Sequence, residues 1–325
     1  LKKLKEMRKI IYILFISLLL MSCENQTKVK QQKDNSTAEI FHYFEKQTGF
    51  FTFSPDSIFK VIGKEGTEIT IPLECLVHQD GTLPTGEITL ELKECYSASD
   101  IVFNNLTTQT KNDLLETAGM IYLQAKASDR VLKVKEGKYI EIKFPKKGKI
   151  KKGMRLFKGK KERDYIVWEE TPISDTARTI APTDTIYSEA SSSGTFIIYQ
   201  KELDYYLFNS PAMGWLNCDK FIEIEKTEMF VFIDTIVVPN IRLIMHRDIR
   251  LAAFAQLEGS NLSFYNIPLG ELATIMGFYK SEGKHYIYKK EIIIAKNMEV
   301  KAVFREVTLE ELKAEIESIK WKESV

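Results

Sequence analysis

Most of the chain alternates apolar and polar residues with a period of two, which is the pattern of β-strands with one buried and one solvated face. The alternation is clear at residues 69–71, 88–93, 121–126 and 140–144, and it resumes in several runs after residue 195. Turn signals such as QDG, EGK and KKG separate the earlier runs. The pattern predicts a mainly β protein with two antiparallel β-sandwich-like domains. The run Met229–Val238 is apolar almost throughout, which predicts a central strand covered on both faces.

Two segments carry helical signals instead. Ser36 and Glu39 stand at capping-box spacing at the start of a short N-terminal helix, and Thr308 and Glu311 do so near the C-terminus. The second pair is followed by an apolar stripe at helical spacing, formed by Leu309, Leu312, Ile316 and Ile319. We expect this C-terminal α-helix to dock on the second domain; the alternative is that it binds a partner helix.

Changes in composition divide the chain. Residues 24–35 are polar, which is typical of a flexible tether, and residues 171–195 are rich in Thr, Ser, Ala and Pro, which is typical of a linker. The predicted organisation is a signal peptide at 1–22, a tether and short helix at 23–45, a β-sandwich at 46–170, a linker at 171–195, and a second β domain with the C-terminal helix at 196–325. Each β domain is long enough to form its own core.

The first residues indicate export. Basic side chains precede the uncharged run Ile10–Met21, which as a helix is too short for the roughly 30 Å hydrocarbon core of a bilayer. The run suits a secretory signal peptide. Its end, Leu20-Met21-Ser22-Cys23, resembles the bacterial lipobox, which implies lipidation of Cys23 and a membrane anchor; the alternative is an ordinary cleaved signal. Glu24 differs from the Asp signal for inner-membrane retention, which favours the outer membrane of the cell envelope.

The distribution of charge along the chain includes one strongly basic segment after the predicted signal peptide. Residues 1–22 hold five basic side chains and one acidic one, so the remaining chain has 41 basic and 44 acidic residues, a formal net charge of −3. That balance gives no indication of a nucleic-acid partner. The segment from Lys133 to Lys161, however, contains 13 basic residues and only two acidic ones, Glu136 and Glu141. The densest part of this segment comprises Lys146, Lys147, Lys149, Lys151, Lys152, Arg155, Lys158, Lys160 and Lys161.

Two interpretations of this basic segment remain open. The lysines are either solvated side chains that protect edge strands from pairing, or a patch that attracts an anionic envelope partner. Such a partner is a lipid headgroup, an acidic polysaccharide or an acidic protein.

Candidate chemistry centres on MGWLNCDKF, residues 213–221. Cys218 is a conceivable nucleophile of a thiol-dependent hydrolase with His246 or His285 as base, but the neighbouring Asp219 would raise the thiol pKa. We prefer a structural interpretation in which the motif forms a turn before a strand. Its motif residues are Gly214, Trp215, Asn217 and Asp219.

The other chemistry-bearing residues are scattered. Cys75 and Cys95 flank neighbouring strand patterns and could form a disulfide, which would leave Cys218 free and buried. The four histidines have no metal-site spacing and no Gly-rich loop opens a helix, so we expect neither a metal nor a cofactor. A further alternative is an adhesin or glycan-binding module with exposed aromatic residues as its platform; the tryptophans are Trp168, Trp215 and Trp321.

Several motifs occur in a familiar order: GTEITIPLECL, GEITLELKE, LLETAGMIYLQA, YIEIKFP and MRLFKG followed by YIVWEE. The chain resembles uncharacterised bacterial envelope lipoproteins that carry a ZU5-like β-sandwich module. In that family a Gly-Trp-Ile-Asn-x-Asp motif often follows, and Gly214, Trp215, Asn217 and Asp219 match it, with Leu216 in place of Ile. The resemblance implies a fold and a location but brings no catalytic residues. We therefore expect a membrane-anchored, non-enzymatic lipoprotein that binds or scaffolds a partner.

Overall fold

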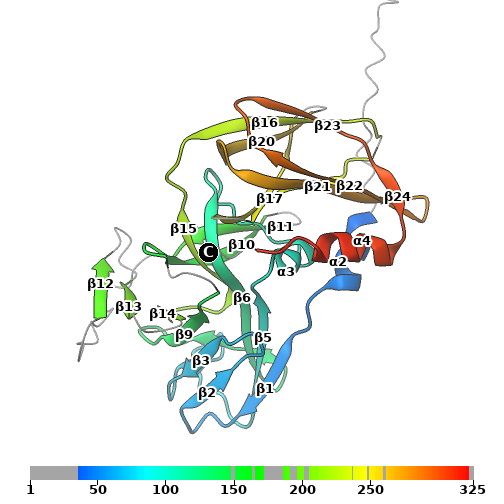
Figure 1. Ribbon diagram of the computed structural model, residues 1–325. Helices are drawn as coiled ribbons and strands as arrows, with labels where there is room; N and C mark the ends of the chain where they lie inside the picture. Colours follow the sequence, from blue (N-terminus) through cyan, green and yellow to red (C-terminus); the bar gives the residue numbers. More distant parts are fainter. Residues whose placement is uncertain are drawn as a thin grey trace, which may run out of the picture. The chain divides into compact units, whose positions relative to one another are not determined.

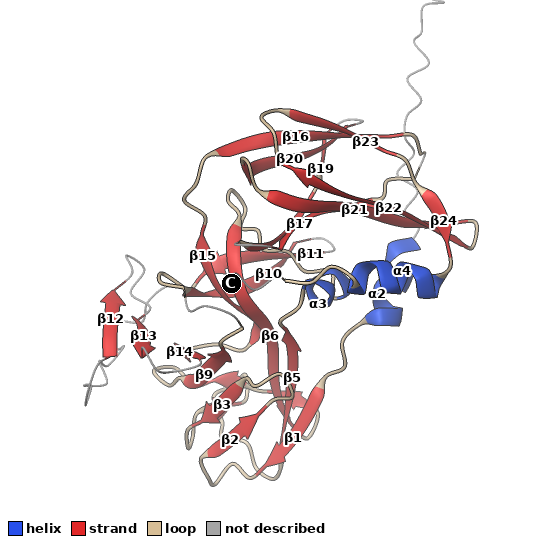
Figure 2. Ribbon diagram, viewed as in Figure 1, coloured by secondary structure: helices blue, strands red, loops and turns tan. Residues whose placement is uncertain are grey.

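The computed structural model describes residues 36–147, 151–162, 165–171, 186–190, 196–200, 205–235, 237–246, 249–258 and 261–321. The predicted signal peptide, the tether with Cys23, and most of the predicted linker lie outside the described residues. The described residues all belong to one compact unit. The protein is mainly β, with several antiparallel sheets and a C-terminal helix, as the alternation predicts (Figure 2).

Two antiparallel sheets form the first sandwich (Figure 1). The first sheet has the order β1-β5-β6-β15-β10-β11, with β7 beside β6. Its strands are Gly49–Phe53 (β1), Ile88–Cys95 (β5), Leu115–Ala127 (β6), Arg130–Val131 (β7), Arg155–Glu162 (β10), Tyr165–Glu170 (β11) and Gly214–Phe221 (β15). The second sheet has the order β12-β13-β14-β9-β3-β2. Its strands are Phe59–Ile62 (β2), Glu68–Ile71 (β3), Ile140–Pro145 (β9), Ile186–Ala190 (β12), Phe196–Gln200 (β13) and Tyr205–Ser210 (β14). Leu76–Val77 (β4) pairs with Lys133–Val134 (β8).

The core of this sandwich follows from the period-two pattern. Alternate residues of β5 and β9 point between the sheets and are at most 2% exposed: Ile88, Leu90, Leu92, Ile140, Ile142 and Phe144. Each such side chain contributes about 1.5–3 kcal/mol when it leaves water. The polar residues between them lie on the outer faces, where Glu91 pairs with Lys126 at 2.5 Å and Glu68 with Lys143 at 3.1 Å.

Two later strands complete the first sandwich. β14 pairs with β9, and β15 lies between β6 and β10 (Figure 1). Both strands follow the segment expected as a linker. The first sandwich therefore includes strands up to Phe221, whereas the sequence pattern predicted the start of the second domain at residue 196. In addition, β12 lies inside the expected linker. The period of a strand shows which face is buried, but it does not show which strand is the neighbour.

The remaining strands form the second sandwich. One sheet has the order β19-β20-β16-β23, formed by Gln256–Glu258 (β19), Asn261–Pro268 (β20), Lys226–Ile233 (β16) and Met298–Ala302 (β23). The other has the order β18-β17-β21-β22-β24, formed by Arg250–Phe254 (β18), Asn240–His246 (β17), Leu272–Ser281 (β21), Lys284–Ile293 (β22) and Arg305–Val307 (β24). β16 ends at Ile233, and Phe232 on its outer face is 43% exposed. The prediction of a strand covered on both faces is therefore wrong.

Three helices lie together beside the sandwiches (Figure 2): Ser36–Phe44 (α2), Ala98–Phe103 (α3) and Leu309–Glu317 (α4). The predicted capping box of α4 is confirmed, because the Thr308 hydroxyl accepts from the Glu311 N–H and the Glu311 carboxylate accepts from the Thr308 N–H. The stripe residues Leu312 and Ile316 are fully buried in a cluster shared with α2, α3 and the β21–β22 face. α4 therefore docks internally, as predicted.

Residues 105–113 connect the two sandwiches. The Thr108 N–H donates to the Ala252 carbonyl on β18 (2.8 Å), while the Trp168 N–H on β11 donates to the Gln109 carbonyl (3.0 Å). Arg242 reaches this segment from β17: its Nη1 donates to the Leu106 carbonyl (2.5 Å) and its Nη2 to Asn105 Oδ1 (2.7 Å). These bonds satisfy backbone groups that would otherwise be buried without partners.

Candidate functional site

The Gly-Trp-Leu-Asn-Cys-Asp motif is a buried strand and not a turn. Gly214 opens β15 at φ +112°, and the Trp215 ring lies 5.4 Å from the Tyr122 ring of β6. Asn217 and Asp219 are both completely buried. These residue types favour turns when their side chains bond locally, but here Asn217 is bonded across the strands. The structural role of the motif is retained, while the predicted turn is wrong.

A buried polar network joins β15 to β6. The Thr117 hydroxyl donates to Asn217 Oδ1 (3.1 Å), and Asn217 Nδ2 donates to Asp219 Oδ2 (2.5 Å). The register shifts here, because Cys218 pairs with Gly119 and Asp219 with Thr117. The other oxygen of Asp219, Oδ1, has no hydrogen-bond partner among the described residues. Burial raises the pKa of Asp219 well above its ordinary value and outweighs the hydrogen bonds, which lower it, so the buried position favours the protonated acid.

This raised pKa makes the stability of the protein depend on pH. Above about pH 4 the unfolded chain ionises Asp219 while the folded chain keeps the proton, so the stabilisation is lost as pH rises. Relative to an Asp219→Asn variant, the wild-type free energy of unfolding should fall by up to about 1.4 kcal/mol per pH unit above that point. Urea denaturation of both proteins between pH 4.5 and 7 measures this difference; a constant or rising difference would contradict the assignment.

The three described cysteines are buried and free, so the possible disulfide between Cys75 and Cys95 is not formed. Cys75 lies in the core of the first sandwich, whereas Cys95 faces the helices. Burial, followed by the neighbouring Asp219, raises the pKa of Cys218 well above its ordinary value. The reactive form of cysteine is the thiolate, so this environment disfavours Cys218 as a nucleophile.

The two candidate bases do not lie with Cys218. His246 belongs to β17 and His285 to β22, both in the five-stranded sheet of the second sandwich, while Cys218 belongs to the core of the first. His285 instead lies near Lys280 and Glu39, and burial lowers its pKa. Cys218, His246 and His285 therefore do not place a nucleophile beside a base.

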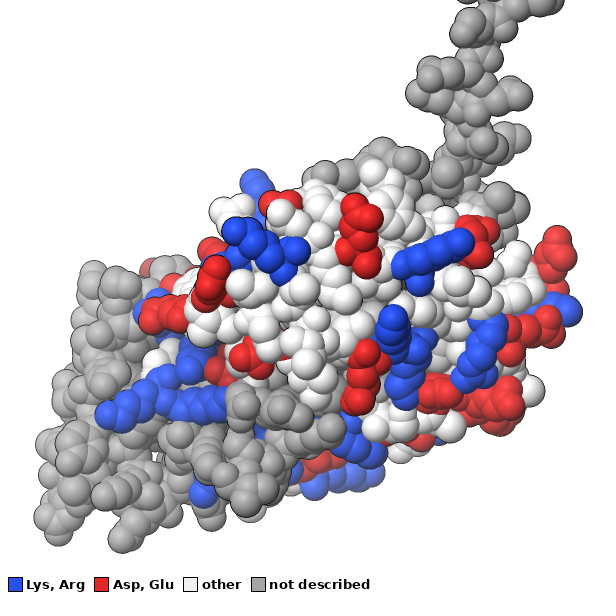
Figure 3. Space-filling model, turned by 45° about the horizontal axis from the view of Figure 1, so that its top comes forward, with Lys and Arg blue, Asp and Glu red and all other residues white. Residues whose placement is uncertain are grey.

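Several cations of the basic segment pair with acids of the same molecule. Lys147 and Lys151 pair with Glu65 and Glu116, and Arg155 and Lys160 pair with Glu170 and Glu169. On the face shown in Figure 3, basic and acidic side chains are likewise interspersed. Lys149 lies outside the described residues, and Lys146 is exposed. Within residues 151–161, the exposed cations that form no ion pair with a described residue are Lys152, Lys158 and Lys161.

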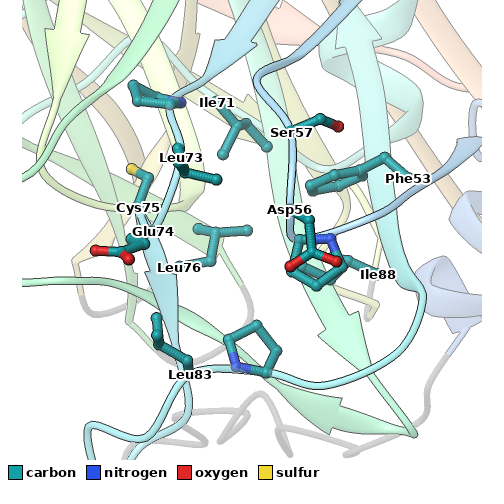
Figure 4. Close-up of a pocket in the computed structure, with 13 residues that line it drawn as sticks. Phe53, Asp56, Ser57, Ile71, Leu73, Glu74, Cys75, Leu76, Leu83 and Ile88 are labelled. Atoms are coloured by element: carbon teal, nitrogen blue, oxygen red, sulfur yellow. The ribbon is translucent and has the colours of Figure 1, made fainter.

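A cavity of about 270 Å³ opens at the end of the first sandwich. Residues 71–76 line one side, Phe53 and residues 55–57 line the other, and Leu83, Pro84 and Ile88 lie on the connecting loop and strand. Figure 4 shows Leu73 and Leu76 pointing across the cavity toward the other side, while the Cys75 sulfur and the Glu74 carboxylate point away from it. Most of the lining side chains are therefore apolar, but polar atoms contribute about as much of the lining surface as apolar ones, and the carboxylate of Asp56 is a charged group at the rim.

The wall of the cavity contains an unusual backbone conformation. Glu74 adopts φ +55° in a turn closed by the Cys75 N–H, which donates to the Pro72 carbonyl (3.2 Å). This left-handed region is uncommon for residues other than Gly, Asn and Asp and costs about 1–3 kcal/mol. Leu73 and Leu83 remain 46% and 48% exposed beside the opening. A hollow with mostly apolar lining side chains, exposed leucines and a carboxylate at its rim, and a strained wall is typical of a binding site.

Sequence reasoning missed this cavity because its walls come from three connections between strands. Pro55, Pro72 and Pro84 mark those connections as turns in the sequence. The prolines do not show that the three turns meet at one end of the sandwich, since that depends on strand order.

Comparisons with known proteins give no match: no family model, no curated protein and no solved structure is similar to this chain. Within the described ranges no helix combines the length and the apolar character needed to span a membrane. Among the same residues no group of His, Cys, Asp and Glu side chains is arranged to hold a metal ion.

Proposed function

We propose that this chain is a lipid-anchored binding protein of the bacterial cell envelope, related to lipoproteins with a ZU5-like module. The lipobox-like ending at Cys23 supports the anchor, and the cavity at the end of the first sandwich is the observation that supports binding. The two sandwiches share a buried helical cluster and are joined by residues 105–113, which gives the cavity a stable support.

The cavity suits an apolar group of a ligand or partner. A cavity of about 150 Å³ already accepts benzene in a protein core, so 270 Å³ accommodates a branched alkyl group or a larger aromatic one. Ile71, Leu76 and Ile88 supply apolar contact, and Asp56 at the rim favours a neutral or cationic polar end over an anionic one.

Binding can be tested with the neutral fluorophore N-phenyl-1-naphthylamine. Its fluorescence should rise on mixing with the wild-type protein, and Ser57→Trp should reduce the increase at least about fivefold because the indole fills the mouth of the cavity. Ile58→Trp is the matched control, since Ile58 is 62% exposed next to Ser57 but does not line the cavity. Equal fluorescence in all three proteins would remove the cavity from the proposal.

The anchor has its own test. We expect Cys23→Ala to abolish acylation, so that the lipid mass is lost in mass spectrometry of the purified protein and anchoring through Cys23 ends. The natural protein should carry the lipid on Cys23 and sediment with envelope membranes, the outer membrane in particular. A bare Cys23 thiol in the natural protein would contradict the lipid anchor while leaving the cavity proposal intact.

One observation favours a second mode of contact. Lys152, Lys158 and Lys161 are exposed and would attract an anionic envelope partner without fixed geometry. The glycan-binding alternative has less support, because Trp168 is 1% exposed and the Trp321 Nε1–H is bonded to the Tyr96 carbonyl at 2.9 Å. The hydrolase alternative would require Cys218 to leave the core in which it is buried.

A further inference from the structure

The first strand of the first sheet has an unprotected edge. β1 is the terminal strand of its sheet and pairs with β5 over five consecutive residues, from Gly49 opposite Leu92 to Phe53 opposite Ile88, without a bulge. Its other edge has no strand neighbour among the described residues. Natural sheets usually block such edges with charged side chains, prolines or bulges, because an open edge accepts another strand.

β1 differs in this respect from the other terminal strands. Each of the four larger sheets has two terminal strands, and seven of these eight carry a charged residue: β2, β11, β12, β18, β19, β23 and β24. The sequence of β1, Gly-Phe-Phe-Thr-Phe, contains neither a charge nor a proline. A charged residue therefore protects every terminal strand of the four larger described sheets except β1.

The side chains of β1 also leave apolar surface uncovered. Phe50 points to the outer face and is 65% exposed, while Phe51 and Phe53 point toward the core but are only half-buried. On the facing sheet the edge strand β2 lies next to β1, with the Phe59 ring stacked on the Phe53 ring at 4.1 Å. The open side of the sandwich thus presents aromatic core residues beside unpaired backbone groups.

We propose that β1 pairs antiparallel with β1 of a second copy of this chain, so that the first sheets of two copies join into one continuous sheet. A two-fold axis needs a surface that is complementary to itself. An uncharged strand meets this condition, because antiparallel pairing of two copies places no like charges opposite each other.

The charges that flank the strand fit the same arrangement. The nearest charged residue before β1 is Lys46 and the nearest after it is Asp56, each five positions from the central Phe51. Antiparallel pairing about Phe51 brings the beginning of one strand to the end of the other. Lys46 is paired with Glu65 and Asp100 of its own chain, so the arrangement places no like charges against each other across the two copies. The pairing also covers Phe50 with the opposing Thr52 and closes the half-buried Phe51 and Phe53. This inference does not depend on the cavity or on its ligand.

The full-length lipidated protein in detergent should be a dimer by size-exclusion chromatography with light scattering. Phe50→Lys should raise the dimer dissociation constant at least about tenfold, because the charge would be placed against an apolar strand. Ile293→Lys is the matched control: Ile293 is 66% exposed, but on β22 of the second sandwich, and its substitution should leave the dimer intact. Both variants alter exposed side chains, so their melting temperatures should match the wild type within about 2 °C.

A register test makes the proposal specific. Phe50 is opposite Thr52 of the other copy, so mixing a Phe50→Lys protein with a Thr52→Glu protein should restore a mixed dimer in native mass spectrometry. A wild-type protein that is monomeric at 50 µM would overturn the proposal, whether or not another protein then binds at β1. A dimer unaffected by Phe50→Lys would overturn it as well, because the copies would then meet elsewhere.

Discussion

Replacing Gly119 with alanine should destabilise the protein by at least about 3 kcal/mol, the largest effect expected for such a substitution among the glycines that the structure describes. A Cβ atom at Gly119 would lie 2.1 Å from Cε1 of the Tyr96 ring, far inside van der Waals contact. The ring is 6% exposed and its hydroxyl is hydrogen-bonded to Thr67 at 2.7 Å, so it cannot move without breaking that bond. Gly119 also adopts φ +147°, which favours glycine.

Gly214→Ala is the control for this experiment. Gly214 begins the neighbouring strand at φ +112°, but no atom lies within 4 Å of a Cβ built there. Its substitution should cost only the backbone strain of about 1–2 kcal/mol in chemical denaturation. In a Tyr96→Leu background the cost of Gly119→Ala should shrink, since the ring is removed. An equal cost for both glycine variants would contradict the overlap with Tyr96.

Arg242→Met should lower the free energy of unfolding by about 3–5 kcal/mol. The guanidinium is completely buried and lies 3.9 Å from the centroid of the Phe254 ring. It donates to Asn240 Oδ1 as well as to the Leu106 carbonyl and Asn105 Oδ1. Burial lowers the pKa of Arg242 to about 9, so the group remains charged at neutral pH. Methionine fills a similar volume but leaves the buried acceptors without a donor.

A second bridge between the sandwiches serves as the comparison. Lys226 pairs with Asp113 at 3.0 Å across the same junction, but both side chains are about one-third exposed or more. Lys226→Met should therefore cost less than about 1 kcal/mol. Arg242→Lys should fall between the two, since lysine is charged but cannot form the planar fork that reaches three acceptors. If Arg242→Met cost no more than Lys226→Met, the buried arginine would not hold the junction together.

Local sequence signals were sufficient for several elements of this fold. The alternation at residues 88–93 and 140–144 corresponds to β5 and β9, and Thr308 with Glu311 begins α4. Long-range pairing was not accessible in the same way. β15 pairs with β6 across about one hundred residues, and no local pattern distinguishes that neighbour from another apolar strand. The sequence pattern predicted a domain boundary at residue 196 because it could not show that β14 and β15 pair with strands of the first sandwich.

For the candidate site, too, local properties could be predicted from the sequence but long-range contacts could not. Cys218 was expected to be free and buried, and the structure confirms this, because unpaired cysteine behaves as a small apolar residue. The basic segment looked like an electropositive patch because its acidic partners, such as Glu65 and Glu116, are distant in sequence. The cavity could not be predicted, since residues 53–57 and 71–76 meet only after both sheets have formed.

Because β14 and β15 are synthesised after the other strands of the first sandwich, the chain remains prone to aggregation until both strands have been added. A nascent chain that ends at Glu170 still lacks the neighbour of β9 and the strand that separates β6 from β10. Synthesis proceeds from the N-terminus, so these apolar ladders stay open until Phe221 has been added. A fragment that ends at Glu170 would therefore be insoluble. Export across a membrane would likewise require the whole chain up to Phe221 to be transported before the first sandwich could fold.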